Sequence, residues 1–224
     1  MSKNQNNHKT IVFAGGCFWG VQHYFSLVKG VINSKVGYAN GKTDNPTYRQ
    51  VCDGITGHTE VCLVKYDTEN TKLQYLLEHF LNIVDTSTLN KQGNDVGTQY
   101  RSGIYYDNEE DKKIIFEFFT ENKSRISDPF VTEILPLNNF WDAEDYHQEY
   151  LDKNPGGKNK LIILNNFFNF LIGYCHINKS KYKSVGILDD ALRITCNPFG
   201  SKYENEEKPK EKIVQRRRYC CAIL

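Results

Sequence analysis

One cysteine near the start of the chain lies between paired glycines and two large aromatic residues, in the sequence Gly15-Gly16-Cys17-Phe18-Trp19-Gly20. The short run 10–14 before it is apolar and β-branched, which predicts a buried strand. After it, apolar residues recur at helical spacing from Phe18 to Val28 and predict a helix. We therefore expect Cys17 at a strand-to-helix turn, with backbone N–H groups of the first helical turn pointing at its side chain.

The expected position of Cys17 favours a reactive thiolate. The N-terminal end of a helix carries partial positive charge, which lowers the pKa of a thiol and makes its sulfur a nucleophile. The alternative is that Cys17 is a buried small apolar residue, the commoner fate of a cysteine in an intracellular protein. Phe18 and Trp19 favour the nucleophile, because two aromatic side chains beside it would wall a small apolar pocket, although core packing also explains them.

Composition and charge narrow the functional classes. A chain of 224 residues can hold one domain of ordinary size and a tail, and its 28 Lys and Arg against 27 Asp and Glu give no general attraction to nucleic acid. The seven cysteines are scattered and form no Cys-x-x-Cys pair, which argues against a disulfide scaffold and against a zinc site. Residues 1–9 are polar and lack the apolar core of a secretory signal, so we expect a cytoplasmic, reducing environment.

The rest of the chain predicts an irregular mixture of strands and helices. Strand-like runs occupy residues 32–38, 60–66, 103–106 and 131–135, and residues 73–81, 111–123 and 142–151 have the pattern of helices. The sequence shows neither an internal repeat nor a dinucleotide-binding fingerprint. The expected fold class is therefore α+β.

Three further features are candidates for a functional site. Glu60 opens the predicted strand 60–66, where a carboxylate is usually solvated, yet one held near aromatic rings would have a raised pKa and could serve as an acid. The loop 92–102 is rich in hydrogen-bonding side chains, which suits either a functional loop or a plain turn. His147 is the one histidine considered for a site, with a packed or surface histidine as the alternative.

Taken together, five stretches resemble the peptide methionine sulfoxide reductases of the A type. They are Gly15-Gly16-Cys17-Phe18-Trp19-Gly20, Asn45-Pro46-Thr47-Tyr48-Arg49, Gly57-His58-Thr59-Glu60, residues 92–102, and Ala143-Glu144-Asp145-Tyr146-His147-Gln148 through Asn154-Pro155. The match covers about residues 8–157. The resemblance implies a ferredoxin-like two-layer sandwich and reduction of the S epimer of methionine sulfoxide, free or within proteins, without a bound cofactor. We expect a monomer without a metal site.

The chemistry of a sulfoxide explains why the family needs these residue types. The sulfur is a poor electrophile until its oxygen is protonated or strongly hydrogen-bonded, so an attacking thiolate needs an acid and hydrogen-bond donors on the opposite side. Cys17 is the nucleophile in this mechanism. The resemblance implies that Glu60 is the acid, and that Tyr48, Tyr100 and Asp95 hold the oxygen and position the site.

The resemblance also implies a methyl pocket and a recycling pathway. Phe18 and Trp19 would receive the methyl group of the substrate and discriminate the epimer by shape. The attack leaves methionine and a sulfenic acid on Cys17, which a second thiol must capture as a disulfide before further oxidation. Cys175 is the expected resolving cysteine, and thioredoxin or another dithiol is the expected reductant. The expected partners are thus thioredoxin and oxidised proteins.

The chain departs from the family pattern near its resolving cysteine, which usually follows an Asn-Pro-Gly turn directly. Here Gly173-Tyr174-Cys175 comes after residues 158–172, which contain only Lys, Asn, Leu, Ile and Phe. We expect an insertion within a reductase domain of residues 8–182, and the composition also suits an unspliced AT-rich intron. A flexible insertion adds little closure entropy, so Cys175 would still reach Cys17.

Two alternatives to a working reductase follow from the same residues. If the insertion displaces Cys175, the chain would be a catalytically impaired, membrane-tethered binding protein. The other alternative is an enzyme that acts on acyl groups through Cys17, which would need an activating histidine and an oxyanion hole.

Residues 183–224 predict a basic, poorly ordered C-terminal extension. Cys196 within it is either a second recycling thiol or a spectator. The last four residues, Cys221-Ala222-Ile223-Leu224, fit a prenylation motif, and Cys220 is a candidate for palmitoylation. Together with the arginines 216–218, these signals would attach the protein to the cytosolic face of a membrane, with a chance match of four residues as the alternative.

Overall fold

The computed structural model of the chain describes residues 7–154. Several expectations therefore fall outside the described residues: the insertion 158–172, the domain boundary at 182 with the extension beyond it, and the cysteines Cys175, Cys196, Cys220 and Cys221. The other expected site residues all lie within the described part.

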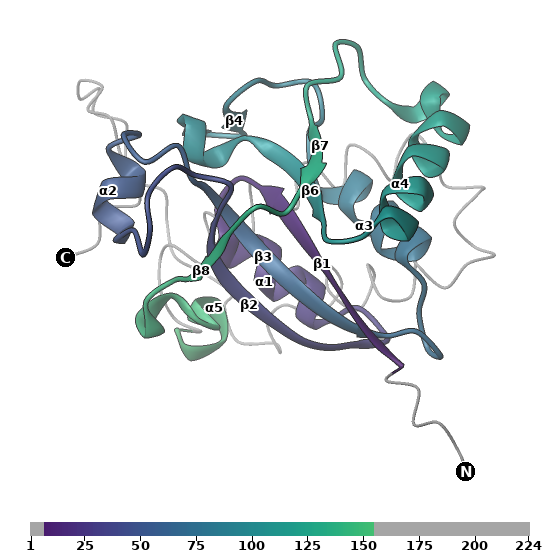
Figure 1. The fold of residues 1–224 in the computed structure, drawn as a ribbon, viewed down its shortest axis with the longest axis horizontal. Helices are drawn as coiled ribbons and strands as arrows, with labels where there is room; N and C mark the ends of the chain where they lie inside the picture. The colour runs from purple at the N-terminus through teal and green to yellow at the C-terminus, as the bar shows by residue number, and fades with distance from the viewer. Residues whose placement is uncertain (1–6, 155–224) are drawn as a thin grey trace, which may run out of the picture. The chain divides into compact units, whose positions relative to one another are not determined.

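A six-stranded sheet forms the centre of the described region (Figure 1). From edge to edge its strands are β7 (Glu133–Pro136), β6 (Ser102–Tyr106), β1 (His8–Gly15), β3 (Thr59–Asp67), β2 (Val31–Ala39) and β8 (Phe140–Asp142). β6 and β7 run parallel, and every other neighbouring pair in this sheet is antiparallel. The register places Gly15, the last residue of β1, opposite Ser102, the first residue of β6.

The helices connect these strands in a regular order. They are α1 (Phe18–Ser26), α2 (Tyr48–Cys52), α3 (Leu73–Ile83), α4 (Glu109–Glu121) and α5 (Tyr150–Lys153), with 3-10 turns η1 (Thr98–Tyr100), η2 (Lys123–Arg125) and η3 (Asp145–His147). The larger elements follow one another as β1-α1-β2-β3-α3-β6, and their four strands lie side by side in the order β6-β1-β3-β2. This is the β-α-β-β-α-β arrangement of ferredoxin-like folds, so the expected α+β class is confirmed.

One face of the sheet packs against the helices. Phe13 on β1 stacks on Phe25 of α1, with ring centroids 4.7 Å apart, and on Phe80 of α3, at 5.4 Å. All three side chains are fully buried. Burial of a side chain of this size stabilises a fold by roughly 1.5–3 kcal/mol relative to its exposure. α1 and α3 are therefore fixed on the same face by apolar packing.

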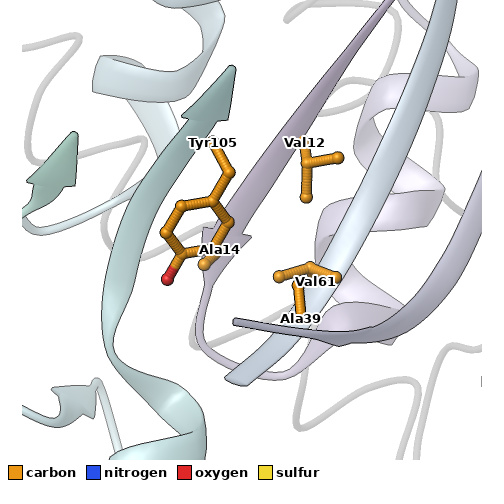
Figure 2. Close-up of a cluster of buried hydrophobic side chains, with 5 residues drawn as sticks. All are labelled: Val12, Ala14, Ala39, Val61 and Tyr105. Carbon is orange, nitrogen blue, oxygen red and sulfur yellow. The ribbon is translucent and has the colours of Figure 1, made fainter. Parts of the chain in front are cut away.

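The opposite face of the sheet is buried as well (Figure 2). A cluster of five fully buried side chains covers it, contributed by four neighbouring strands: Val12, Ala14, Ala39, Val61 and Tyr105. Leu63, Leu137 and Phe140 pack against this cluster. Each central strand thus carries apolar side chains on both faces, so a polar residue among them needs a particular explanation.

Glu60 is such a residue, and the register of β3 shows which face it occupies. Cys62 pairs with Phe13 across β1 and β3, so both side chains lie on the helix-covered face. Side chains alternate along a strand, which places Glu60, two residues before Cys62, on that face too. Tyr38 of β2 pairs directly with Glu60. A carboxyl group and a phenol therefore lie side by side on the face that carries α1.

The prediction of a helix over residues 142–151 is wrong. This segment instead forms the end of β8, the turn η3 and the short helix α5. The Gln148 side chain accepts a hydrogen bond from Val36 N–H at 3.0 Å and donates to Val36 O at 2.9 Å, so it pairs with the backbone of β2. Glu149 then adopts a left-handed conformation with φ +54°, which interrupts any continuous helix.

Two short elements were also not expected. Helix α2 begins at a capping box, in which Thr47 Oγ1 accepts from Gln50 N–H and the Gln50 side chain accepts from Thr47 N–H. The loop 92–102 takes part in a small hairpin of β4 (Lys91–Gln92) and β5 (Asp95–Val96), followed by η1. Both elements lie next to the candidate site.

A buried histidine should make the fold sensitive to acid. His79 of α3 is 1% exposed, its Nδ1 lies 2.6 Å from the Tyr24 hydroxyl, and burial lowers its pKa from 6.5 to about 4. Between these values the unfolded chain binds a proton that the folded chain does not. The contribution of His79 to the free energy of unfolding is therefore fully present above pH 6.5. It is lost as the pH drops toward 4, by about 3 kcal/mol in all.

We expect His79→Gln to be less stable than the wild type near neutral pH but to lose less stability on acidification. Urea unfolding of both proteins near pH 7 and near pH 5 measures the two losses. Equal losses would show that His79 does not carry this pH dependence.

Candidate active site

Cys17 lies at the turn between β1 and α1, as expected, where it is the N-cap residue of α1. Gly16 before it has φ +80°, a conformation that favours glycine, and a Cβ at this position would lie 2.6 Å from Gln92 Cβ. The turn is therefore tight, and the hairpin that carries Gln92 packs directly against it. Within the described region, the Cys17 side chain does not cap the helix.

The first free N–H group of α1 has a different partner from the one expected. Phe18 N–H donates to Glu60 Oε2 at 3.0 Å, whereas the sequence suggested that such groups point at the thiol. Glu60 is 1% exposed. The N–H groups of the first helical turn need hydrogen-bond acceptors from outside the helix, and here a carboxyl oxygen on β3 is one of them. The nucleophile candidate and the acid candidate are thus joined through one backbone group.

Glu144 is a site residue that sequence reasoning missed, although it lies within a quoted motif. Its Oε1 accepts from Tyr48 N–H at 2.9 Å, and its Oε2 accepts from the Tyr38 hydroxyl at 2.7 Å. Burial alone would raise the pKa of Glu144, but these two hydrogen bonds are the largest of the interactions that outweigh burial, and the pKa is lowered. Burial and the neighbouring Glu144 in turn raise the pKa of Tyr38. An ionised Glu144 therefore faces a neutral phenol.

An aromatic cluster surrounds His147. Phe18 lies 5.1 Å from His147, Trp19 lies 5.5 Å away and Tyr48 lies 4.5 Å away, measured between ring centroids. Trp19 also stacks on Tyr150 of α5 at 3.9 Å. The structure thus brings together three predicted site residues from α1 and α2, with His147 at their centre.

His147 itself is neutral in this setting. It is 1% exposed, and Trp19 Nε1 donates to its Nδ1 at 3.1 Å. Burial lowers the pKa of His147 to about 4, and the nearby Glu144 opposes this shift only in part. His147 therefore belongs to the candidate site rather than to the surface.

The loop that carries Asp95 and Tyr100 leads into β6 and lies against the turn that carries Cys17. Asp95 pairs with Gln92 across the hairpin, so the two side chains share one face, and Gln92 packs on Gly16. Burial raises the pKa of Asp95, which favours a neutral carboxyl group able to donate a hydrogen bond. Tyr100 is fully buried in η1, two residues before the strand that pairs with Gly15.

Three residues of the quoted motifs fasten the site loops to one another. His58 Nδ1 accepts from Gly41 N–H at 3.1 Å, so its Nε2 carries the proton and donates to Thr43 O at 2.8 Å. Thr59 Oγ1 donates to Gln99 O at 2.8 Å, and Arg101 Nη2 donates to Gly57 O at 3.2 Å. The segments that deliver Tyr48, Glu60 and Tyr100 are thus tied together, a role that the residue types alone did not reveal.

Among residues 7–154, no three His, Cys, Asp or Glu side chains gather into a group that could hold a metal ion. None of the helices formed by those residues is both long and apolar enough to cross a membrane.

Known proteins are similar to this chain in sequence. The sequence model of the family described as peptide methionine sulfoxide reductase matches residues 9–171. The peptide methionine sulfoxide reductase MsrA of Clostridium acetobutylicum is 50% identical over 175 residues, which cover 78% of this chain and 98% of that protein. The corresponding protein of Clostridium botulinum is 48% identical over 170 residues, 76% of this chain and 98% of its own length.

Two solved structures have the same fold. Mxr1 from Saccharomyces cerevisiae in its reduced form superimposes with a TM-score of 0.65 at 40% identity, over 70% of this chain and 91% of its own. Methionine sulfoxide reductase A of Corynebacterium diphtheriae gives a TM-score of 0.61 at 36% identity, over 70% of this chain and 80% of its own.

Proposed function

The chain belongs to the peptide methionine sulfoxide reductase family, and from this premise we propose that it reduces the S epimer of methionine sulfoxide, free or within proteins, with Cys17 as the nucleophile. The observation that carries the proposal is the hydrogen bond from Phe18 N–H to Glu60. It holds a buried carboxyl group beside the residue that follows Cys17. A thiol and an acid close together are what the attack on a sulfoxide requires.

The remaining residues supply the oxygen and methyl sides of the site. Glu60 donates a proton to the sulfoxide oxygen as Cys17 attacks the sulfur, and Tyr48, Tyr100 and a neutral Asp95 donate hydrogen bonds to that oxygen. The raised pKa of Asp95 supports the last role.

The aromatic cluster receives the methyl group. Phe18 and Trp19 contribute its surface, and both are buried and close to His147. A rigid aromatic wall on the methyl side, opposite donors on the oxygen side, favours one epimer at sulfur over the other.

The reaction then needs a second thiol. The oxygen passes from the substrate sulfur to Cys17, so methionine is released and Cys17 becomes a sulfenic acid. Cys175 attacks this sulfenic acid, which gives a disulfide and water. Thioredoxin, whose two thiols are oxidised in the exchange, returns Cys17 and Cys175 to thiols. No prosthetic group takes part in any of these steps.

The test compares reductants on peptides that contain the S or the R epimer. We expect the wild type to reduce only the S epimer, with dithiothreitol or with thioredoxin. Cys175→Ser should keep its activity with dithiothreitol and lose it with thioredoxin, because dithiothreitol reduces the sulfenic acid directly. Cys196→Ser is the matched control and separates a second recycling thiol from a spectator. Formation of methionine, followed by chromatography, is the measurement.

Two results would contradict parts of the proposal. Wild-type turnover with dithiothreitol but not with thioredoxin would mean that residues 158–172 prevent recycling through Cys175. Binding of the sulfoxide peptide without turnover by either reductant would instead identify a catalytically impaired binding protein.

A further inference from the structure

We propose that Glu144 and His147 are positioning residues that act together on Trp19 and Tyr48, so that one carboxylate sets the spacing between the methyl side and the oxygen side of the site. This inference rests on the proposed function, and it goes further by assigning a task to two residues that do not themselves react.

The Trp19 contact defines the state of His147. An indole N–H group can only donate a hydrogen bond, so His147 Nδ1 at 3.1 Å must be the acceptor. The imidazole proton then lies on Nε2. Both side chains are buried, with exposed fractions of 4% for Trp19 and 1% for His147, so loss of this bond would leave a buried donor without an acceptor.

Glu144 stabilises that proton position. Its Oε2 lies 3.9 Å from His147 Nε2, outside hydrogen-bond range but close enough for electrostatic attraction. Within residues 7–154, no other group accepts from this Nε2. A carboxylate beside Nε2–H favours the tautomer in which Nδ1 is free to accept from Trp19. His147 also follows Glu144 in one tight turn, since His147 N–H donates to Glu144 O at 2.9 Å.

The same carboxylate holds the other side of the site. Glu144 Oε1 accepts from Tyr48 N–H, so the start of α2 is fixed by the group that orients His147. Tyr48 and His147 also touch, with ring centroids 4.5 Å apart. Glu144 therefore fixes both sides of the site: it holds Tyr48 on the oxygen side directly and Trp19 on the methyl side through His147. The distance between the oxygen and the methyl group of the substrate is fixed, so a change in the position of Glu144 would make the substrate bind less well.

The test uses substitutions that separate ring packing from the hydrogen bond. Asn places its side-chain oxygen where His147 Nδ1 lies, whereas Gln places its oxygen where Nε2 lies, so only His147→Asn retains an acceptor for Trp19. His147→Phe retains the ring and loses the acceptor. All variants are made in a Trp141→Phe background, because Trp19 is then the only tryptophan of the chain.

We expect His147→Gln and His147→Phe to shift the fluorescence of Trp19 to shorter wavelength, as its N–H loses its partner. KM for the S-epimer peptide should rise about 10-fold while kcat changes less than about 3-fold, because a substrate contact is disturbed and the reacting groups are not. His147→Asn should restore both the emission and KM. Glu144→Gln should shift the emission in the same direction and raise KM, since the charge that favours the Nε2–H tautomer is lost.

Either of two results would overturn the inference: an unchanged Trp19 emission in His147→Gln, or equal KM values for His147→Asn and His147→Gln. The Asn and Gln pair decides the matter even if His147→Phe fails to fold. The fluorescence is measured without substrate, so it tests the contact independently of turnover. A wild type that binds no sulfoxide would therefore refute the proposed function without affecting this measurement.

Discussion

Turnover of methionine sulfoxide should disappear when Cys17 is replaced by serine, with dithiothreitol or thioredoxin as the reductant. A serine hydroxyl at the same N-cap position remains protonated and is a far weaker nucleophile than a thiolate, so we expect a loss of at least ~10³-fold. The fold should be retained, because the Cys17 side chain does not cap α1 in the described structure. Methionine formation from the S-epimer peptide measures the loss.

A matched control and a trapping experiment make this prediction specific to Cys17. Cys52→Ser, at the end of α2, replaces another partly buried thiol and should retain activity. In Cys175→Ser, one equivalent of sulfoxide should give one equivalent of methionine and a sulfenic acid on Cys17 that dimedone captures. Residual turnover by Cys17→Ser, or dimedone on another cysteine, would show that the nucleophile lies elsewhere.

Sequence reasoning correctly placed the features that depend on local patterns. Cys17 could be predicted because a buried strand, two glycines and a helical pattern surround it within a few positions. The amphipathic spacing of α3 and the apolar runs of β1 and β3 likewise follow from the periodicity of a single element. Where a residue's type and its immediate neighbours determine its place in the fold, the prediction agrees with the structure.

The contacts that sequence reasoning missed join residues far apart in the chain. Glu144 binds Tyr48 across 96 positions, and Trp19 binds His147 across 128 positions. No local pattern contains such a partner. The wrong helix over residues 142–151 has the same origin, because Gln148 pairs with the backbone of β2, 112 positions away, and tertiary contacts override helical propensity there.

One contact at the Cys17 turn was missed for a similar reason. Strand and helix were placed correctly, but the first N–H group of α1 donates to Glu60, which comes from a strand three elements later. The N-terminus of α1 thus holds the Glu60 carboxyl group at the residue that follows Cys17, so one hydrogen bond links the segments of two candidates found separately in the sequence.

Replacing that acid gives the second large effect. Glu60→Gln should slow the reduction step by at least ~100-fold, because the amide cannot transfer a proton to the sulfoxide oxygen. The amide oxygen can still accept from Phe18 N–H, so the contact that places the side chain at 3.0 Å from α1 is preserved. A single turnover of the reduced protein with limiting reductant isolates this step from disulfide recycling.

A surface variant completes the test of Glu60. Glu110→Gln removes a carboxylate that pairs with Lys9 on the surface and should behave as the wild type does. A rate for Glu60→Gln within about 3-fold of the wild type would mean that another group donates the proton, and Asp95, with its raised pKa, would be the next to replace.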